Sequence, residues 1–328
     1  MMRGARRWFT YAVLVLGSAT FLYLLWSFGP LRVWERLRNF GWGFALVLPF
    51  QIFDHALNAL GWRFAFPSDQ VSRVPFWRLV KVRIAGDGVN YLTPSGNVAG
   101  EFVRPAMMDG CVAEDVMVTS VVVAKAAQAV GQAVFVLFGL IWLLQGSLYA
   151  FQGRQAIWAT LSMSGILAGV CIGLVLLAME PPAWVKRRFP AAMASTEGVR
   201  ALLRDYLRGH PGRLAVSSFF FMLGYAWGAA EIWLIMRLLG FPLALSTALA
   251  VEFLSNVVDA MMFMVPAKIG TQEAGKTAIF AGLGLPADLG FTVGFIRHAR
   301  ELIWAGAGFA MFAVHERGVK DAAAARAL

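Results

Sequence analysis

The stretch Asn90–Pro105, NYLTPSGNVAGEFVRP, separates two strongly apolar regions with proline, glycine and polar side chains. A lipid-facing helix cannot hold such a break, because each backbone group freed in hydrocarbon costs several kcal/mol. The stretch therefore lies in an aqueous loop, or at membrane depth where protein or a water-filled cavity surrounds it. The second arrangement would make it a working site.

The composition around this stretch is that of a membrane protein. Of the 328 residues, 59% are hydrophobic and 15% are charged, whereas soluble domains are roughly 45–50% apolar and about 25% charged. We expect an all-α polytopic protein with one integral membrane domain over residues 1–328 and no separate domain of enzyme size. The two cysteines and four histidines lack ligand spacing, so we expect no metal and no cofactor.

The net charge of +10 has a simple explanation in a membrane protein. Lysine and arginine gather at the ends of the apolar segments, as in cytoplasmic loops. We expect no nucleic-acid partner, but contact with anionic lipid headgroups at the cytoplasmic face. The basic loop 180–213 and both termini are predicted to be cytoplasmic, in a bacterial inner membrane.

Six spans are predicted, at about 8–28, 41–66, 116–144, 156–179, 214–239 and 289–314. The charge pattern then makes residues 68–114 begin and end inside, and residues 241–288 begin and end outside. The simplest topology is six spanning helices plus two opposed re-entrant helical hairpins, with an eight-span count left open. The basic residues of 68–83, including Arg83, are expected at the interface.

The two halves of the chain resemble each other, repeat A at about 41–145 and repeat B at about 214–314. Pro94 and Gly100-Glu101 in the first match Pro266, Gly270 and Glu273 in the second. A buried cation, Lys125 or Arg297, follows 24 residues after each glutamate. Inverted repeats with broken segments near the midplane are typical of transporters that work by alternating access.

Charged residues inside apolar segments usually face the protein interior and form pairs. Arg104, Lys125, Arg297 and Arg300 are predicted to hold a phosphate, and Glu101 and Glu273 an amine or the cations themselves. A purely structural network of ion pairs is the alternative. We predict no catalytic residue, and the candidate substrate-binding residues are Asn90, Pro94, Gly100, Glu101, Arg104, Lys125, Pro266, Gly270, Glu273, Arg297 and Arg300.

Two of these motifs resemble a known family. Asn90, Pro94, Gly100-Glu101 and Arg104 resemble an element of the membrane region of lysylphosphatidylglycerol synthases, and the segment Pro266–Glu273 resembles that family's second signature. The similarity spans roughly residues 10–315, and Arg300 stands where the family usually has an arginine. The resemblance implies a stand-alone, flippase-like member without the soluble domain that makes the aminoacylated lipid. Lys268 and Thr271 depart from the small residues expected there, which indicates a different headgroup.

The leading hypothesis is therefore a lipid flippase that moves a lipid with a phosphate or amine headgroup. Aminoacyl-phospholipids, hopanoids and polyprenyl-linked lipids are the classes considered, moved without ATP because no Walker motif is present. An enzyme is not expected. The runner-up is a membrane-embedded transferase with Glu101 as general base. A third reading is a non-transporting partner subunit of a lipid-modifying enzyme, and a homodimer is left open.

Overall fold

The computed structural model of the chain describes residues 2–93, 99–108, 110–146, 165, 183–188, 190–262 and 265–326. All regular secondary structure within these residues is helical. This confirms the predicted all-helical class. The predicted fourth span, residues 156–179, lies outside the described residues apart from Gly165.

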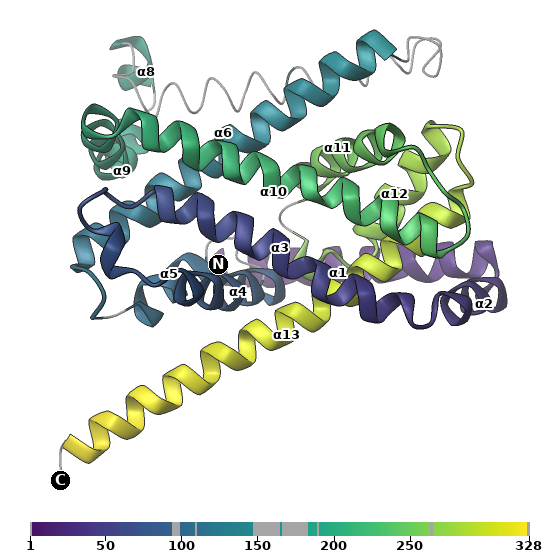
Figure 1. Cartoon of the computed structure of the whole chain (residues 1–328), viewed down its shortest axis with the longest axis horizontal. Coiled ribbons are helices and arrows are strands. Elements are labelled where there is room, and N and C mark those ends of the chain that lie inside the picture. The colour runs from purple at the N-terminus through teal and green to yellow at the C-terminus, as the bar shows by residue number, and fades with distance from the viewer. Residues whose placement is uncertain are drawn as a thin grey trace. The chain divides into compact units, whose positions relative to one another are not determined.

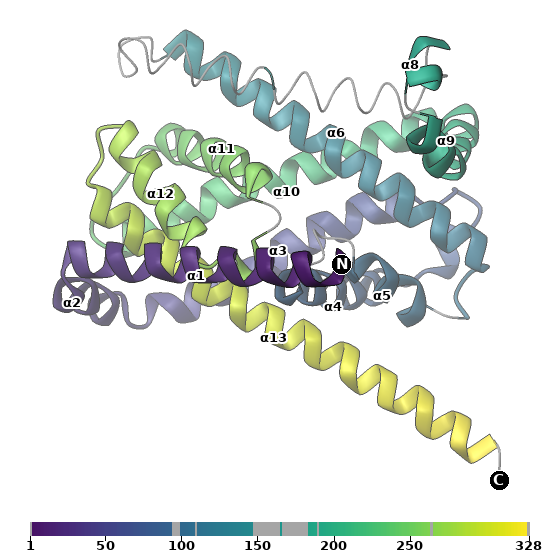
Figure 2. The ribbon, with the colours of Figure 1, turned by 180° about the vertical axis from the view of Figure 1, so that it is seen from behind.

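The long helices α1, α3, α6 and α10 cover predicted apolar spans, and Figures 1 and 2 show the helices from two sides. In chain order they are α1 (Met2–Phe28), α2 (Pro30–Phe40), α3 (Gly43–Phe64), α4 (Phe76–Leu92), α5 (Ala99–Met107), α6 (Glu114–Gly146), α8 (Ala183–Arg188), α9 (Pro190–Gly209), α10 (Pro211–Leu238), α11 (Leu245–Met261), α12 (Thr271–Gly282) and α13 (Ala287–Arg326). Two short 3-10 helices, η1 (Val71–Arg73) and η2 (Pro266–Lys268), lie between them.

Three helices of the described residues, α3, α6 and α10, are long and apolar enough to cross a membrane. A fourth crossing is possible if α1 and α2, which meet at a bend of 88°, together form one span. Helix α13 has 40 residues and would extend about 60 Å, but Arg297, Arg300 and Glu301 interrupt its apolar character. These helices support a multi-pass membrane protein.

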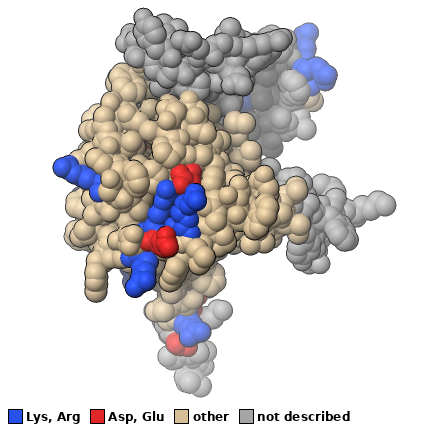
Figure 3. Space-filling model, turned by 90° about the vertical axis from the view of Figure 1, so that its right-hand side faces the viewer, with Lys and Arg blue, Asp and Glu red and all other residues tan. Residues whose placement is uncertain are grey.

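The surface also suits a lipid environment. Large apolar side chains such as Trp26, Leu31 and Phe102 are about three-quarters exposed, and exposed apolar surface on this scale marks contact with lipid or protein. On the face drawn in Figure 3, the described residues are mostly uncharged, and the charged side chains gather in small groups.

The helices group into two compact units. The first comprises residues Met1–His55, Val80–Met107 and Ala226–Leu328, and the second comprises Ala56–Leu79 and Met108–Tyr225. The first unit therefore holds α1, α2, α5, α11, α12 and α13 with parts of α3, α4 and α10. Both broken elements singled out in the sequence lie in this first unit.

The apolar core of the first unit is built on the last helices of the chain. Buried Ile232, Ile235 and Met236 of α10 pack with residues of α11, α12 and α13. Helix α12 lies closely along α13 because α13 has glycine at the contact: a Cβ on Gly290 would come 2.5 Å from the carbonyl oxygen of Lys276. Small residues allow such close helix approach in membranes.

The second unit is held together by long-range hydrogen bonds to backbone carbonyls. Tyr206 donates to the carbonyl of Phe64 at 2.8 Å, Arg213 to that of Phe66 at 2.8 Å, and Ser217 to that of Gly61 at 2.7 Å. Burial raises the pKa of the Tyr206 phenol above its usual range, because desolvation disfavours the phenolate. The predicted basic loop 180–213 thus contains two helices, α8 and α9, that are part of this unit.

Candidate functional site: a charged cavity beside two broken elements

The break between α4 and α5 is closed by Asn90, at the C-terminal end of α4. The side-chain oxygen of Asn90 accepts a hydrogen bond from the backbone N–H of Gly100 at 2.7 Å, and its amide donates to Glu101 at 3.3 Å. The first N–H groups of a helix have no partner within that helix, so Asn90 supplies one. Gly100 has to be glycine here, because a Cβ would lie 2.0 Å from the carbonyl oxygen of Gly86.

Arg104 is fully buried and pairs with acidic residues of α4 and α5. Its guanidinium contacts Glu101 at 2.6 Å and Asp87 at 3.1 Å. Asp87 also accepts a hydrogen bond from Arg83 at 2.8 Å and lies 3.7 Å from Nδ1 of His55. Arg83, which was expected at the membrane interface, is thus covered by protein in the first unit. Arg83 is buried because it lies one turn before Asp87 on the same face of α4.

The second break, between α11 and α12, has an unusual backbone. Ala267 and Lys268 both have φ of 51°, in the left-handed region, and Gly270 follows with φ of 73° at the start of α12. A non-glycine residue in this region costs roughly 1–2 kcal/mol. The Lys268 ammonium contacts Asp259 of α11 at 2.8 Å, which stabilises this conformation.

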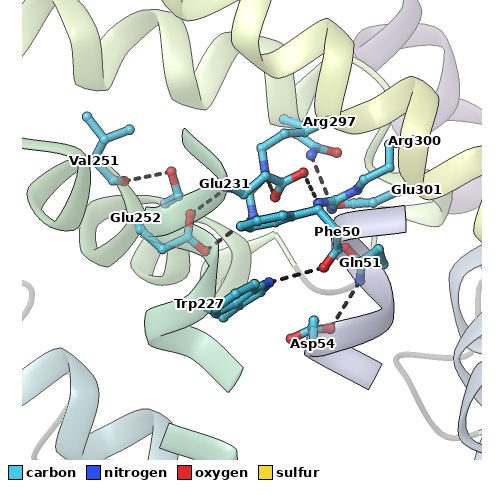
Figure 4. Close-up of polar contacts among 12 residues, drawn as sticks. Phe50, Gln51, Asp54, Trp227, Glu231, Val251, Glu252, Arg297, Arg300 and Glu301 are labelled. Carbon is cyan, nitrogen blue, oxygen red and sulfur yellow. Dashed lines mark hydrogen bonds and ion pairs between the residues drawn. The ribbon is translucent and has the colours of Figure 1, made fainter. Parts of the chain in front are cut away.

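Helix α13 carries the cations of a buried ion-pair network, drawn in Figure 4. Arg297 contacts Glu252 of α11 at 2.5 Å and Glu231 of α10 at 3.1 Å. Arg300 contacts Glu231 as well, and also the neighbouring Glu301 at 3.2 Å. Removing one partner of such a buried pair leaves an uncompensated charge, which lowers stability by about 3–5 kcal/mol.

Residues from both broken elements meet on α13. Nδ1 of His298 lies 2.5 Å from a carboxylate oxygen of Glu273 on α12. The ring of Tyr91, at the end of α4, packs edge-on against the His298 ring with 6.4 Å between centroids. Gln272, next to Glu273, donates to Glu301 at 3.2 Å. The two broken elements therefore approach the same short segment of α13.

A cavity of about 180 Å³ opens beside this meeting point. Its lining comes from α3, α4, η2 and α13, and consists of Gln51, Asp54, His55, Ile84, Asp87, Gly88, Tyr91, Lys268, Glu301, Trp304 and Ala305. Indole N–H groups brace the α3 wall next to Pro49: Trp304 donates to the carbonyl of Leu48 at 2.9 Å, and Trp227 to that of Phe50 at 3.1 Å.

The ionisable groups of the lining are mostly acidic. Asp54, Asp87 and Glu301 face it from three helices, against one ammonium, that of Lys268. The nearby arginines are already paired: Arg83 with Asp87, Arg104 with Asp87 and Glu101, and Arg300 with Glu231 and Glu301. The cavity thus combines carboxylate oxygens with an aromatic hydroxyl and an imidazole, groups that can accept hydrogen bonds from a cation. Among the described residues, no group of three histidine, cysteine or acidic side chains is placed to hold a metal ion.

The predicted site residues fall into two buried networks and some outliers. Asn90, Gly100, Glu101 and Arg104 form the first network. Glu273, Arg297 and Arg300 belong to the second, and Gly270 begins the helix that positions Glu273. Pro266 is the first residue of η2, and Pro94 lies outside the described residues. Lys125 is half-buried on α6, in the second unit.

The predicted substrate-binding residues did not include several residues of the cavity lining, namely Asp54, His55, Asp87, Tyr91, Lys268 and Glu301. The charge of Asp54 within an apolar span was a usable signal, because ionisable residues in such spans mark functional sites. The pairing of Arg83 with Asp87 four residues later was a second signal. No pattern in the sequence singled out Tyr91 as a residue of the lining.

These features define a class: a helical, multi-pass membrane protein with a charged cavity beside two broken elements. The family model for the lysylphosphatidylglycerol synthase TM region matches residues 10–307. The chain therefore belongs to that family, as its motifs predicted, and is linked to lipid metabolism or lipid flipping. No curated protein and no solved structure showed significant similarity to the chain.

Proposed function

We propose that this protein is a lipid flippase that moves an amine-bearing lipid across a bacterial inner membrane. The headgroup enters the cavity of the first unit while the acyl chains stay in the bilayer. Both termini face the cytoplasm, as the distribution of lysine and arginine predicts. Transport needs no covalent step, so the protein is proposed not to be an enzyme.

The observation that carries this proposal is the shared lining of the cavity. Tyr91 ends the helix before the first break, and Lys268 lies within the second break, yet both line the same space. Discontinuous helices of transporters form their substrate sites in this way. A change at either break would alter the cavity, which is what alternating access requires.

The size of the cavity favours a headgroup over a whole lipid. Its 180 Å³ is below the roughly 300–1,000 Å³ of pockets that enclose a drug-sized ligand. A diacyl phospholipid has two long acyl chains in addition to its headgroup, and these do not fit. The chains therefore remain in hydrocarbon, against the exposed apolar surface.

The charges favour an amine over a bare phosphate. The predicted phosphate ligands Arg104, Arg297 and Arg300 are each held by two carboxylates. A phosphate would have to displace those partners and approach Asp54 and Glu301. Both oxygens of Asp87 are held by Arg83 and Arg104, so an ammonium group meets Asp54 and Glu301 in the lining, and charge-assisted hydrogen bonds of this kind are the strong ones.

The helix lengths support re-entrant hairpins. Helices α4 and α11 have 17 residues each and extend about 26 Å, less than the roughly 30 Å of a bilayer core. Each is followed by a break and a still shorter helix. We propose that the two elements enter from opposite faces, as an inverted repeat.

The alternative, a membrane-embedded transferase, needs a free general base. Glu101 was its predicted base, but one oxygen of Glu101 contacts Arg104 at 2.6 Å and the other accepts from Asn90. A carboxylate engaged on both oxygens is poorly placed to remove a proton from a substrate. The geometry therefore supports transport over transfer.

Transport by purified protein in liposomes tests the proposal. Two fluorescent lipids with identical acyl chains are compared, aminoacylated phosphatidylglycerol and phosphatidylglycerol. We expect the wild type to move the amine-bearing lipid at least several-fold faster. Asp54→Asn should remove most of this preference, because it neutralises a carboxylate of the lining without changing its shape.

Asp115→Asn is the matched control, since Asp115 is an exposed acid at the start of α6. The proposal is contradicted if the wild type moves both lipids at the same rate. It is also contradicted if protein-free liposomes move the lipids as fast as liposomes that contain the protein. Product formation on a lipid acceptor by the purified protein would instead support the transferase.

A further inference from the structure

A second cavity lies in the second unit, between α6 and α10. It measures about 370 Å³ and is lined by Val130, Gly131, Val134, Pro211, Leu214, Ala215, Ser218, Phe219 and Met222. Both helices are among those long and apolar enough to cross a membrane. The lining is apolar except for one hydroxyl group, that of Ser218. We call this cavity the α6–α10 groove.

Close packing at one glycine accounts for the groove. A Cβ on Gly131 would lie 2.6 Å from the carbonyl oxygen of Ser218 and 2.9 Å from the backbone nitrogen of Met222. The two helices thus touch through their backbones at Gly131. Ala215 and Ser218 are small, and they leave space next to this contact that larger side chains would fill.

The Ser218 hydroxyl has an unmet hydrogen bond. The residue is only 8% exposed, and its oxygen has no hydrogen-bond partner among the described residues. Ser217, its neighbour, is bonded to the carbonyl of Gly61. A buried hydroxyl normally finds a partner, and a ligand in the groove would provide one.

The position of the groove indicates what that ligand is. It begins at Pro211, two residues after the end of α9. The Arg208 side chain near that end is 81% exposed, with the exposed carboxylate of Asp205 3.9 Å from it. Ser218 lies seven residues further along α10, about 10 Å along the helix axis. An amphiphile with an anionic head at Arg208 would therefore place its glycerol-ester region near Ser218 and a hydrocarbon chain beyond it.

We propose that the α6–α10 groove binds one anionic phospholipid of the surrounding bilayer. One acyl chain fills the apolar groove, an ester carbonyl accepts a hydrogen bond from Ser218, and the phosphate lies against Arg208. The attraction of basic segments to anionic lipids provides the headgroup preference. This site lies wholly in the second unit and does not depend on the transport function.

Lipid binding to the purified full chain tests the site. The protein is delipidated in detergent and titrated with phosphatidylglycerol or with phosphatidylcholine of the same chain length. Native mass spectrometry counts bound lipids, and thermal unfolding gives the lipid-induced shift in Tm. For the wild type we expect one phosphatidylglycerol held at least tenfold more tightly than phosphatidylcholine, and a higher Tm with lipid.

Two variants separate binding from folding. Ala215→Phe fills the groove and should abolish the tight lipid, whereas Val216→Phe, on an exposed position outside the lining, should retain it. Ser218→Ala removes only the hydroxyl. Without lipid, the Tm of this variant should equal or exceed that of the wild type, because the variant no longer buries a hydroxyl that lacks a partner. Its binding of phosphatidylglycerol should be several-fold weaker.

Equal binding of the two lipids would overturn the proposal. So would a Ser218→Ala protein that binds phosphatidylglycerol as tightly as the wild type. If Ala215→Phe fails to fold, the Ser218→Ala measurement decides alone.

Discussion

The side-chain oxygen of Asn90 accepts a hydrogen bond from the backbone N–H of Gly100 at 2.7 Å, across the break between α4 and α5. Ten residues separate them, and the contact joins the end of one helix to the start of the next. The side-chain amide of Asn90 also donates a hydrogen bond to Glu101, which in turn accepts one from Arg104. A motif that suggested a substrate site in the sequence is thus first a device that stabilises a helix break.

Replacing Asn90 by alanine should destabilise the protein by about 1–2 kcal/mol, because the N–H of Gly100 and the carboxylate of Glu101 each lose a partner. Thermal unfolding of the purified protein measures this. Asn39→Ala, at an exposed position on α2, is the control and should leave the Tm within about a degree. An unchanged Tm for Asn90→Ala would show that Asn90 does not close the break.

Gly100→Ala should be more damaging than a glycine change in open space. A Cβ at Gly100 would lie 2.0 Å from the oxygen of Gly86, whereas one at Gly306 of α13 would meet nothing within 4 Å. We expect Gly100→Ala to cost about 1–3 kcal/mol or more through overpacking. Gly306→Ala should stabilise by roughly 0.5–1 kcal/mol, since glycine is unfavourable within a helix. Similar effects of the two changes would contradict the close approach of α4 and α5.

The left-handed backbone of η2 predicts a stabilising substitution. Ala267 has φ of 51°, so Ala267→Gly should relieve strain and raise stability by up to about 1 kcal/mol. Ala278→Gly, in the exposed middle of α12, should lower stability by about 1 kcal/mol. Chemical denaturation of both variants measures the difference. If both are destabilised equally, Ala267 does not adopt this conformation.

Arg297→Gln should be strongly destabilising, by about 3–5 kcal/mol, because Glu252 and Glu231 lose the cation between them. The double variant Arg297→Gln with Glu252→Gln should recover part of this loss, since the uncompensated charge is then removed. Arg38→Gln, on an exposed position of α2, is the control. A double variant that is less stable than Arg297→Gln alone would show that the uncompensated buried charge is not the main cause of the lost stability.

The fold could be predicted in part from the sequence, for physical reasons visible at particular residues. Hydrophobic length located α3, α10 and most of α6, because a helix within a bilayer needs an unbroken apolar run. It did not locate a helix at residues 190–209, which is polar and packs within the second unit. Helix α13 was found in spite of its charges, because apolar residues flank Arg297 and Arg300.

The site was harder to predict because pairing is a tertiary property. Arg104 and Arg297 stood out as buried cations, but nothing in the sequence indicates that each contacts two carboxylates. Arg104 contacts Asp87 and Glu101, and Arg297 contacts Glu231 and Glu252. The expectation of a phosphate ligand assumed that these cations were unpaired. The cavity instead depends on Asp54 and Glu301, two charged residues of apolar segments that come together only once α3 and α13 face each other across it.

The central claim is that a lipid headgroup enters the cavity lined by Tyr91, Lys268 and Glu301. A structure of the wild type in lipid nanodiscs containing an aminoacylated phosphatidylglycerol tests this most directly. We predict headgroup density in the cavity, with its ammonium nitrogen within hydrogen-bond distance of Asp54 or Glu301 and its acyl chains outside. A cavity without lipid density, or one closed by its own side chains in the presence of excess lipid, would contradict the account.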